Sequence, residues 1–140
     1  MKRTANAHWA GDLKQGKGEI TTQSGVLDNS PYGFNTRFEN QKGTNPEELI
    51  AGAHAGCFTM ALSAALGKAG FTPESLETKA EVELAQVDGN WTVTQIDLNL
   101  NGKVPGIDNA KFQEIALDAK KNCPISRLLN ANITLKATLA

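Results

Sequence analysis

Apolar and polar residues alternate with a period of two in several segments, and this pattern predicts half-buried β-strands. In residues 79–85, small or branched apolar side chains alternate with glutamates, and residues 91–101 continue the pattern with isoleucine and leucine. Between them lies Val-Asp-Gly-Asn at 87–90, and an Asp-Gly pair between alternating runs is typical of a tight hairpin turn. The two segments are therefore predicted to pair as a hairpin.

Shorter segments near both ends of the chain also have strand patterns. These predicted strands cover residues 4–9, 18–23, 34–38 and 133–139. Residues 29–33, Asn-Ser-Pro-Tyr-Gly, have the composition of a turn. In residues 34–38 a period of two places both phenylalanines on one face of the strand and Arg37 on the other.

A long helix is predicted from about residue 46 to residue 66. Thr44 or Asn45 can cap it, Pro46 suits the first helical position, and two glutamates follow near the positive end of the helix dipole. After these acids no charged residue occurs until Lys68. A helix that is apolar on all sides is predicted to be central and covered on every side.

Two shorter helices are predicted further along. Asp108 can cap a helix over residues 109–121, and a short helix follows at 124–129. Together the elements predict an α+β fold for residues 1–140 as a single domain, with antiparallel sheets wrapped around central apolar helices. One sheet of a 140-residue chain is too small to cover the long helix. We therefore expect a second copy to help bury it in an intertwined homodimer.

The composition is that of an ordinary soluble globular protein, with 40% apolar and 21% charged residues. A net charge of −1 does not favour nucleic acid as a partner, and no basic run favours an anionic membrane. The uncharged stretch 49–67 is long enough to raise the question of a membrane span. It is rich in Ala and Gly and poor in Leu and Ile, so a buried helix is predicted instead. We find no secretory signal, and a cytoplasmic location is expected.

The two cysteines are the first candidates for chemistry. Cys57 lies within the apolar helix, where an inert core thiol is the ordinary interpretation, although Ala53 and Gly56 leave space above the sulfur. Cys123 precedes Pro124 at a helix start, where a thiolate is favoured, although it could also be a poor cap. A separation of 66 positions excludes a Cys-x-x-Cys redox motif and paired zinc motifs.

A reactive thiolate at Cys57 would need a cationic neighbour, and Arg37 is the candidate because arginine stays charged when desolvated. Glu47 is the candidate carboxylate to hold the guanidinium. A solvated strand residue and an ordinary helix-start acid are the alternatives. Glu47 and Cys57 stand ten positions apart, about 15 Å along a helix axis. We therefore hypothesise that Glu47 reaches this site from the partner subunit.

The segments that hold these residues resemble the osmotically inducible protein C (OsmC) family, which is related to the organic hydroperoxide resistance proteins. The resemblance runs through nearly the whole chain in order. Its matching segments are 7–9, 24–27, 31–38, 43–49, 54–58, 104–108 and 122–126. Residues 31–38, Pro-Tyr-Gly-Phe-Asn-Thr-Arg-Phe, resemble the osmotically inducible branch more than the resistance-protein branch.

The resemblance implies a homodimeric, cofactor-free and metal-free thiol peroxidase that reduces organic hydroperoxides at sites on the dimer interface. It assigns Cys57 as the peroxidatic cysteine, Cys123 as the resolving cysteine, Arg37 as the family's arginine and Glu47 as its glutamate. Cys57 would become a sulfenic acid and then a disulfide with Cys123, which an external dithiol, for example of the lipoyl type, would reduce. The family name further implies an antioxidant role in peroxide and osmotic stress.

Two other functions are compatible with the residues. A cysteine hydrolase could use Cys57 as nucleophile and His54 as base, because the two stand three apart on one helix face. Such an enzyme would not need Cys123. A non-catalytic module that binds a small ligand could instead keep both thiols buried and inert.

Overall fold

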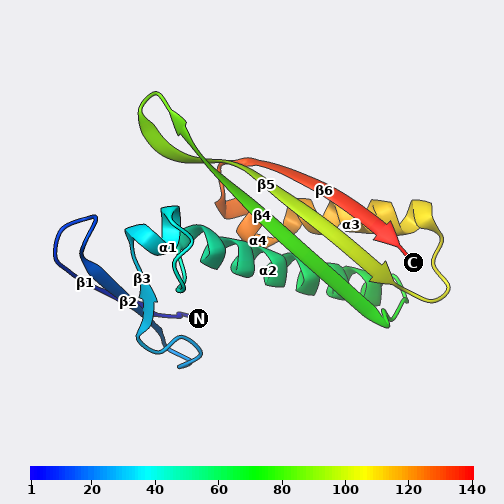
Figure 1. The fold of residues 1–140 in the computed structure, drawn as a ribbon. Helices are drawn as coiled ribbons and strands as arrows, with labels where there is room; N and C mark the ends of the chain where they lie inside the picture. Colours follow the sequence, from blue (N-terminus) through cyan, green and yellow to red (C-terminus); the bar gives the residue numbers. More distant parts are fainter. The chain divides into compact units, whose positions relative to one another are not determined.

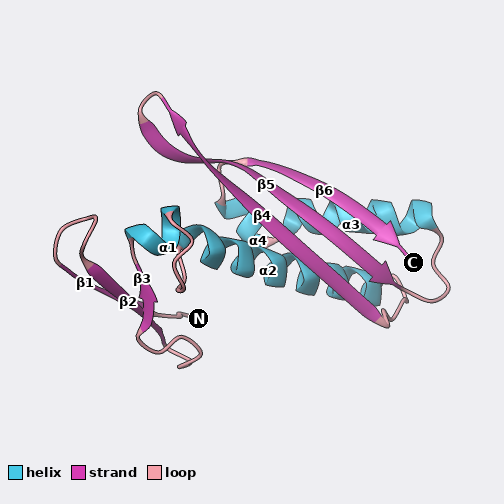
Figure 2. Cartoon of the chain, in the orientation of Figure 1, coloured by secondary structure: helices cyan, strands magenta, loops and turns pink.

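The computed structural model describes residues 1–140, and the chain consists of two compact units, Met1–Leu49 and Ile50–Ala140. The elements of each unit are labelled in Figure 1 and distinguished as helix, strand and loop in Figure 2. The long helix α2 (Pro46–Lys68) begins in the first unit and contributes most of its length to the second.

The first unit is a three-stranded antiparallel sheet followed by a short helix. β1 (Ala5–Ala10) pairs with β2 (Lys17–Thr22), and β2 pairs with β3 (Ser30–Tyr32). The first two predicted strands are therefore confirmed to within one residue at each end. The predicted turn at 29–33 contains β3, because Ser30 and Pro31 pair with the edge of β2 that does not pair with β1.

The strand predicted over residues 34–38 is wrong, because these residues form helix α1 (Phe34–Phe38). Phe34 and Phe38 are four positions apart, a spacing that places two side chains on one face of a helix as well as of a strand. Their ring centroids lie 4.9 Å apart. Arg37 does not face away from both rings as predicted. Its guanidinium carbon lies 5.3 Å from the centroid of the Phe38 ring, within the range of a cation–π contact.

Helix α2 begins at Pro46, as predicted. The side chain of Asn45 caps it by accepting a hydrogen bond from the Glu48 backbone N–H at 2.8 Å. The helix ends two residues before Gly70, whose φ of +87° lies in the left-handed region that terminates helices. Capping residues at both ends thus determine the length of the helix.

The second unit is built on a long hairpin of β4 (Ser75–Val87) and β5 (Asn90–Lys103). The predicted two-residue turn is confirmed, with positive φ at Asp88 (+51°) and Gly89 (+80°). Such values match the type I′ turn that Asp-Gly favours, and its twist suits the flanking strands.

The chain then forms helix α3 (Asn109–Asn122), helix α4 (Pro124–Leu128) and strand β6 (Asn132–Leu139). Asp108 caps α3 as predicted, by accepting from the Lys111 N–H at 2.8 Å. β6 pairs with β5 in parallel, so the expectation of purely antiparallel sheets does not hold for this pair. The helical crossover after β5 brings the chain back along the sheet in the same direction, which a tight turn cannot do.

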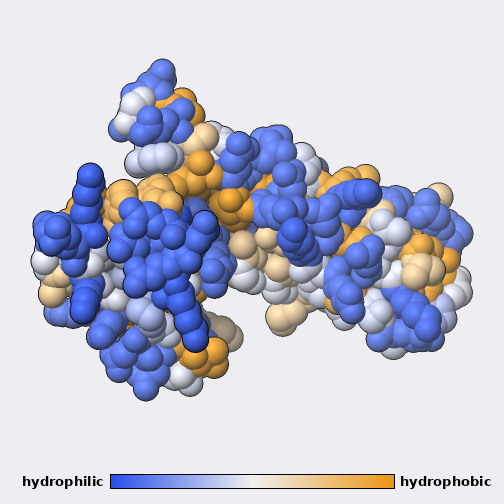
Figure 3. Space-filling model, viewed as in Figure 1, coloured by the Kyte–Doolittle hydropathy of each residue, from blue (hydrophilic) through white to orange (hydrophobic).

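The core of the second unit lies between this sheet and the helices α2 and α3 on one of its faces (Figure 1). β5 contributes Ile96, Leu98 and Leu100. α3 contributes one apolar stripe, formed by Phe112, Ile115, Ala116 and Ala119. The glutamates of β4 alternate to the opposite, solvent-facing side of the strand. Figure 3 shows mainly hydrophilic residues over this outer face, with smaller apolar areas between them.

Helix α2 is covered on one face only within a single chain. Its buried residues are His54, Phe58, Leu62 and Leu66, which are spaced four apart and form one stripe. The expectation that the helix is covered on every side therefore does not hold for one copy. By length and composition α2 could cross a membrane, but its buried stripe forms part of the core of the second unit.

Candidate functional site

The two cysteines meet in the second unit although 66 positions separate them. Cys57 lies in the middle of α2, and Cys123 is the residue before α4. Their sulfur atoms are 3.0 Å apart and both thiols are free. Cys57 is half-buried, whereas Cys123 is fully buried. The fold therefore places one accessible and one protected thiol within reach of each other.

The surroundings shift the pKa values of the two thiols in opposite directions. Burial raises the pKa of Cys57, and the neighbouring Cys123 raises it further. Burial also acts to raise the pKa of Cys123, but hydrogen bonds with the Cys57 thiol, with the backbone N–H groups of Ser126 and Ile125 and, least of all, with the Ser126 hydroxyl outweigh it and lower that pKa. Within the second unit alone, the more acidic thiol is therefore Cys123, and a thiolate at Cys57 requires a further positive group.

A buried histidine–serine pair adjoins the cysteines, and sequence analysis did not predict it. His54 Nε2 lies 2.8 Å from the Ser126 hydroxyl oxygen. His54 is fully buried, its Nδ1 has no hydrogen-bond partner, and burial lowers its pKa. His54 stands three positions before Cys57, and Ser126 three positions after Cys123. These matching intervals in the two cysteine motifs were the signal that could have revealed the pair.

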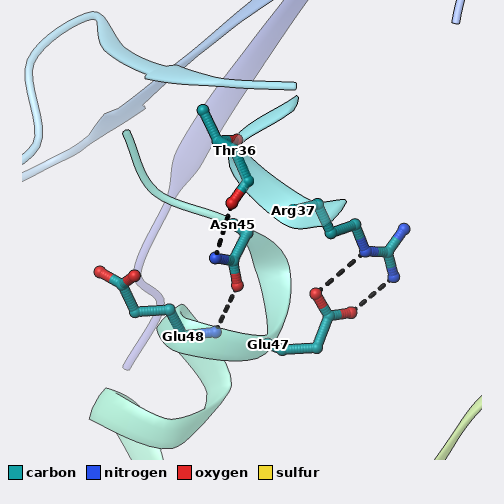
Figure 4. A network of polar contacts seen from close by, with 5 residues as sticks. All are labelled: Thr36, Arg37, Asn45, Glu47 and Glu48. Atoms are coloured by element: carbon teal, nitrogen blue, oxygen red, sulfur yellow. Dashed lines mark hydrogen bonds and ion pairs between the residues drawn. The ribbon is translucent and has the colours of Figure 1, made fainter. Parts of the chain in front are cut away.

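In the first unit, Arg37 and Glu47 form a forked ion pair (Figure 4). Arg37 Nε donates to Glu47 Oε2 at 3.0 Å and Nη2 to Oε1 at 2.5 Å. The Glu47 side chain is 13% exposed, so most of the carboxylate is shielded from water. The Glu47 carboxylate therefore lies against the Arg37 guanidinium, and the catalytic role of the pair stays a prediction. Two parallel charge-assisted bonds fix the plane of the guanidinium as well as its position.

Asn45 links the two helices that carry this ion pair (Figure 4). Its Nδ2 donates to the Thr36 carbonyl in α1 at 3.3 Å, while its Oδ1 caps α2 through the Glu48 N–H. Arg37 follows Thr36, and Glu47 precedes Glu48. One amide side chain therefore sets the separation of the helix segments that present Arg37 and Glu47. Asn45 was predicted as a cap, but its contact with α1 depends on the tertiary structure.

A small apolar cavity of about 100 Å³ adjoins Arg37 within the first unit. It is lined by Trp9, Leu13, Tyr32, Gly33, Phe34, Arg37, Phe38 and Pro46. The helical conformation of residues 34–38 turns both phenylalanines and Arg37 toward this cavity. A molecule with an apolar group and a polar end could therefore contact the aromatic rings and the guanidinium together.

Comparison with known proteins identifies a family that matches most of the chain. The family model described as OsmC-like protein matches residues 39–138.

The chain belongs to the OsmC-like protein family.

Curated relatives match almost the whole chain. Peroxiredoxin OsmC of Escherichia coli (strain K12) is 56% identical over 135 residues, which cover 96% of this chain and 94% of that protein. Organic hydroperoxide resistance protein OhrB of Bacillus subtilis (strain 168) is 34% identical over 124 residues, covering 87% and 88%. The predicted family is thus confirmed.

Solved structures of the family have the same fold. The crystal structure of OhrB of Bacillus subtilis aligns with a TM-score of 0.73 at 29% identity and covers 96% of this chain and 98% of that one. An OsmC-like protein of unknown function from Vibrio cholerae aligns with a TM-score of 0.79 and covers 99% of both chains. Its identity is 15%, so this second likeness concerns the fold alone. The α+β class predicted from the sequence is confirmed.

Proposed function

We propose that this chain is a thiol peroxidase that reduces organic hydroperoxides to alcohols by means of Cys57 and Cys123. The observation that carries the proposal is the 3.0 Å distance between two free thiol sulfurs, one half-buried and one fully buried. The names of the relatives, peroxiredoxin OsmC and organic hydroperoxide resistance protein OhrB, support the same chemistry.

The reaction consists of three balanced steps. The Cys57 thiolate attacks the outer oxygen of the hydroperoxide, the O–O bond breaks, and the alkoxide takes a proton and leaves as an alcohol. Cys57 is then a sulfenic acid. Cys123 attacks this sulfur, an S–S bond forms, and the hydroxyl group leaves as water. An external dithiol, for example of the lipoyl type, reduces the disulfide by exchange and is itself oxidised. No metal or organic cofactor takes part.

Arg37 supplies the positive charge that this mechanism needs at Cys57. Burial raises the pKa of Cys57 within its own unit, so a guanidinium nearby is required to favour the thiolate. The forked bond to Glu47 keeps the guanidinium oriented. The aromatic cavity beside Arg37 takes the organic group of the substrate, and we therefore expect organic hydroperoxides to react faster than hydrogen peroxide.

The active unit is an intertwined homodimer in which residues 1–140 act as one domain. A single chain leaves most of α2 uncovered, and Met60 in its middle is 76% exposed. A helix of this hydropathy requires an apolar partner, and a second copy provides one. In this arrangement Arg37 and Glu47 of one subunit act on Cys57 of the other. A cytoplasmic location suits a disulfide that must be reduced again after each turnover.

Mixed dimers test whether the ion pair acts across the interface. Arg37→Ala and Cys57→Ser homodimers are each expected to be inactive. After the two are unfolded and refolded together, half of the dimers carry one chain of each kind, so action in trans restores about a quarter of the wild-type sites. No recovery, with mixed dimers verified by native mass spectrometry, would show that Arg37 acts on its own chain.

A single-turnover experiment tests the peroxidase function itself. One equivalent of cumene hydroperoxide is added to the reduced wild type, Cys57→Ser and Cys123→Ser, and the products are identified by mass spectrometry. We expect an intramolecular disulfide in the wild type, no reaction in Cys57→Ser and a sulfenic acid on Cys57 in Cys123→Ser. Unchanged thiols in the wild type would contradict the function. A sulfenic acid on Cys123 in Cys57→Ser would reverse the order of the two cysteines.

A further inference from the structure

Four polar side chains lie close together inside the second unit. His54 Nε2 lies 2.8 Å from the Ser126 hydroxyl, Ser126 stands three positions after Cys123 at the start of α4, and the Cys123 sulfur lies 3.0 Å from the Cys57 sulfur. Two of the members lie on α2, Ser126 lies on α4, and Cys123 caps α4. The proposed mechanism uses only the two cysteines, and so far gives no role to the buried histidine and serine.

The protons available on Ser126 and His54 determine which group donates in each hydrogen bond of this cluster. A serine hydroxyl has one proton to donate. If Ser126 donates it to the Cys123 sulfur, then His54 must be the donor to Ser126, which requires the proton on Nε2. His54 Nδ1 then carries only a lone pair, and the structure gives this atom no partner. The other tautomer would bury an unpaired N–H and would use the serine proton on His54. Orphaned buried N–H groups are rarer than orphaned acceptors.

We propose that His54 and Ser126 together hold Cys123 ready for the resolving step. Ser126 contacts the reacting sulfur and donates a hydrogen bond to its thiolate. His54 is a positioning residue, which acts by fixing the direction of the Ser126 hydroxyl. The inference rests on the proposed peroxidase function, because the resolving step exists only if Cys57 becomes a sulfenic acid.

The resolving step leaves His54 and Ser126 chemically unchanged. The Cys123 thiolate attacks the Cys57 sulfur, an S–S bond forms, and the S–O bond of the sulfenic acid breaks. The departing hydroxide combines with the proton that Cys123 had released and becomes water. His54 stays neutral and Ser126 keeps its proton, so no additional oxidant or reductant is required.

The charged groups on the elements around Cys123 do not replace Ser126 as the hydrogen-bond donor to its thiolate. Lys120 and Lys121 lie in the last turn of α3, and Arg127 lies in the last turn of α4. Lys120 Nζ is already bound to the Ile133 carbonyl at 2.7 Å. β5 presents isoleucine and leucine to these helices, the charged residues of β4 are exposed, and the lysine of β6 is exposed. The pKa of Cys123 is lowered despite burial, mainly through Cys57 and the backbone N–H groups of Ser126 and Ile125, with a smaller contribution from the Ser126 hydroxyl.

The test is the pH dependence of disulfide closure. Reduced protein is mixed with one equivalent of cumene hydroperoxide between pH 5 and 9, and sulfenic acid and disulfide are followed separately by quenched-flow mass spectrometry. In Ser126→Ala we expect the midpoint of the closure rate to rise by about one pH unit and closure below that midpoint to slow about tenfold. Ser126→Thr retains the hydroxyl and should restore the wild-type profile.

Substitutions of His54 test the positioning role. In His54→Leu we expect the same upward shift as in Ser126→Ala. His54→Gln offers an amide N–H in place of Nε2–H and should largely restore the profile. If sulfenic acid forms and the folded Ser126→Ala protein closes its disulfide with the wild-type profile, the inference is overturned and the peroxidase function stands. If the wild type forms no sulfenic acid at Cys57, the proposed function itself fails. Thermal unfolding confirms that each variant is folded.

Discussion

The buried, neutral His54 predicts how the stability of this protein depends on pH. Burial lowers the pKa of His54 below its ordinary value of 6.5, whereas the unfolded chain exposes the ring to water. The unfolded state therefore binds a proton first as the pH falls below 6.5. Stability associated with His54 is fully present above pH 6.5 and is lost as the pH falls toward the pKa of the folded state.

The magnitude follows from the linkage of one proton. A single group that titrates only in the unfolded state changes the free energy of unfolding by at most about 1.4 kcal/mol per pH unit. From pH 6.5 to 5.0 we therefore expect a loss that approaches, and does not exceed, about 2 kcal/mol from this residue. The lowered pKa of Asp97 acts below its ordinary value of 3.8, so that carboxylate does not contribute in this window.

Urea denaturation of the reduced protein at fixed concentration, every half pH unit from 5.0 to 7.5, measures this slope. We expect the free energy of unfolding of the wild type to fall below pH 6.5 and that of His54→Gln to stay nearly level. His8→Gln is the matched control, because His8 lies on an exposed strand, and it should follow the wild type. A slope that persists in His54→Gln would refute the assignment of His54 as a buried neutral group.

Three further substitutions have expected effects. Arg37→Lys should lower kcat/KM for cumene hydroperoxide about tenfold to a hundredfold, because a lysine cannot form the fork to Glu47; unchanged steady-state kinetics would contradict a need for the fork. Asp108→Ala removes the cap of α3 and should cost about 1 kcal/mol in urea denaturation, without slowing disulfide formation. Gly102→Ala should cost about 1–3 kcal/mol, because its Cβ would lie 2.7 Å from the Phe112 ring; an unchanged Tm would show that the ring yields.

Most elements of the fold could be predicted from the sequence because their signals are local. Asn45, Pro46 and Gly70 set the ends of α2 through hydrogen bonds and backbone angles that involve a few neighbouring residues. The Asp-Gly turn and the alternation on either side of it determine the hairpin in the same way. The prediction was wrong where the spacing of apolar residues is compatible with both a helix and a strand. Phe34 and Phe38 satisfy both a helix and a strand, and only the surrounding structure selects the helix.

The sequence by itself identified the candidate residues for chemistry, because thiols, a guanidinium and a carboxylate are recognisable by type and motif. The tertiary structure decided which of them meet. It brings Cys57 within 3.0 Å of Cys123 and His54 within 2.8 Å of Ser126, across 66 and 72 positions of the chain. Such contacts depend on how α2 and α4 pack together in the core of the second unit. No local preference encodes that packing, because its free energy comes from apolar surface buried between distant segments.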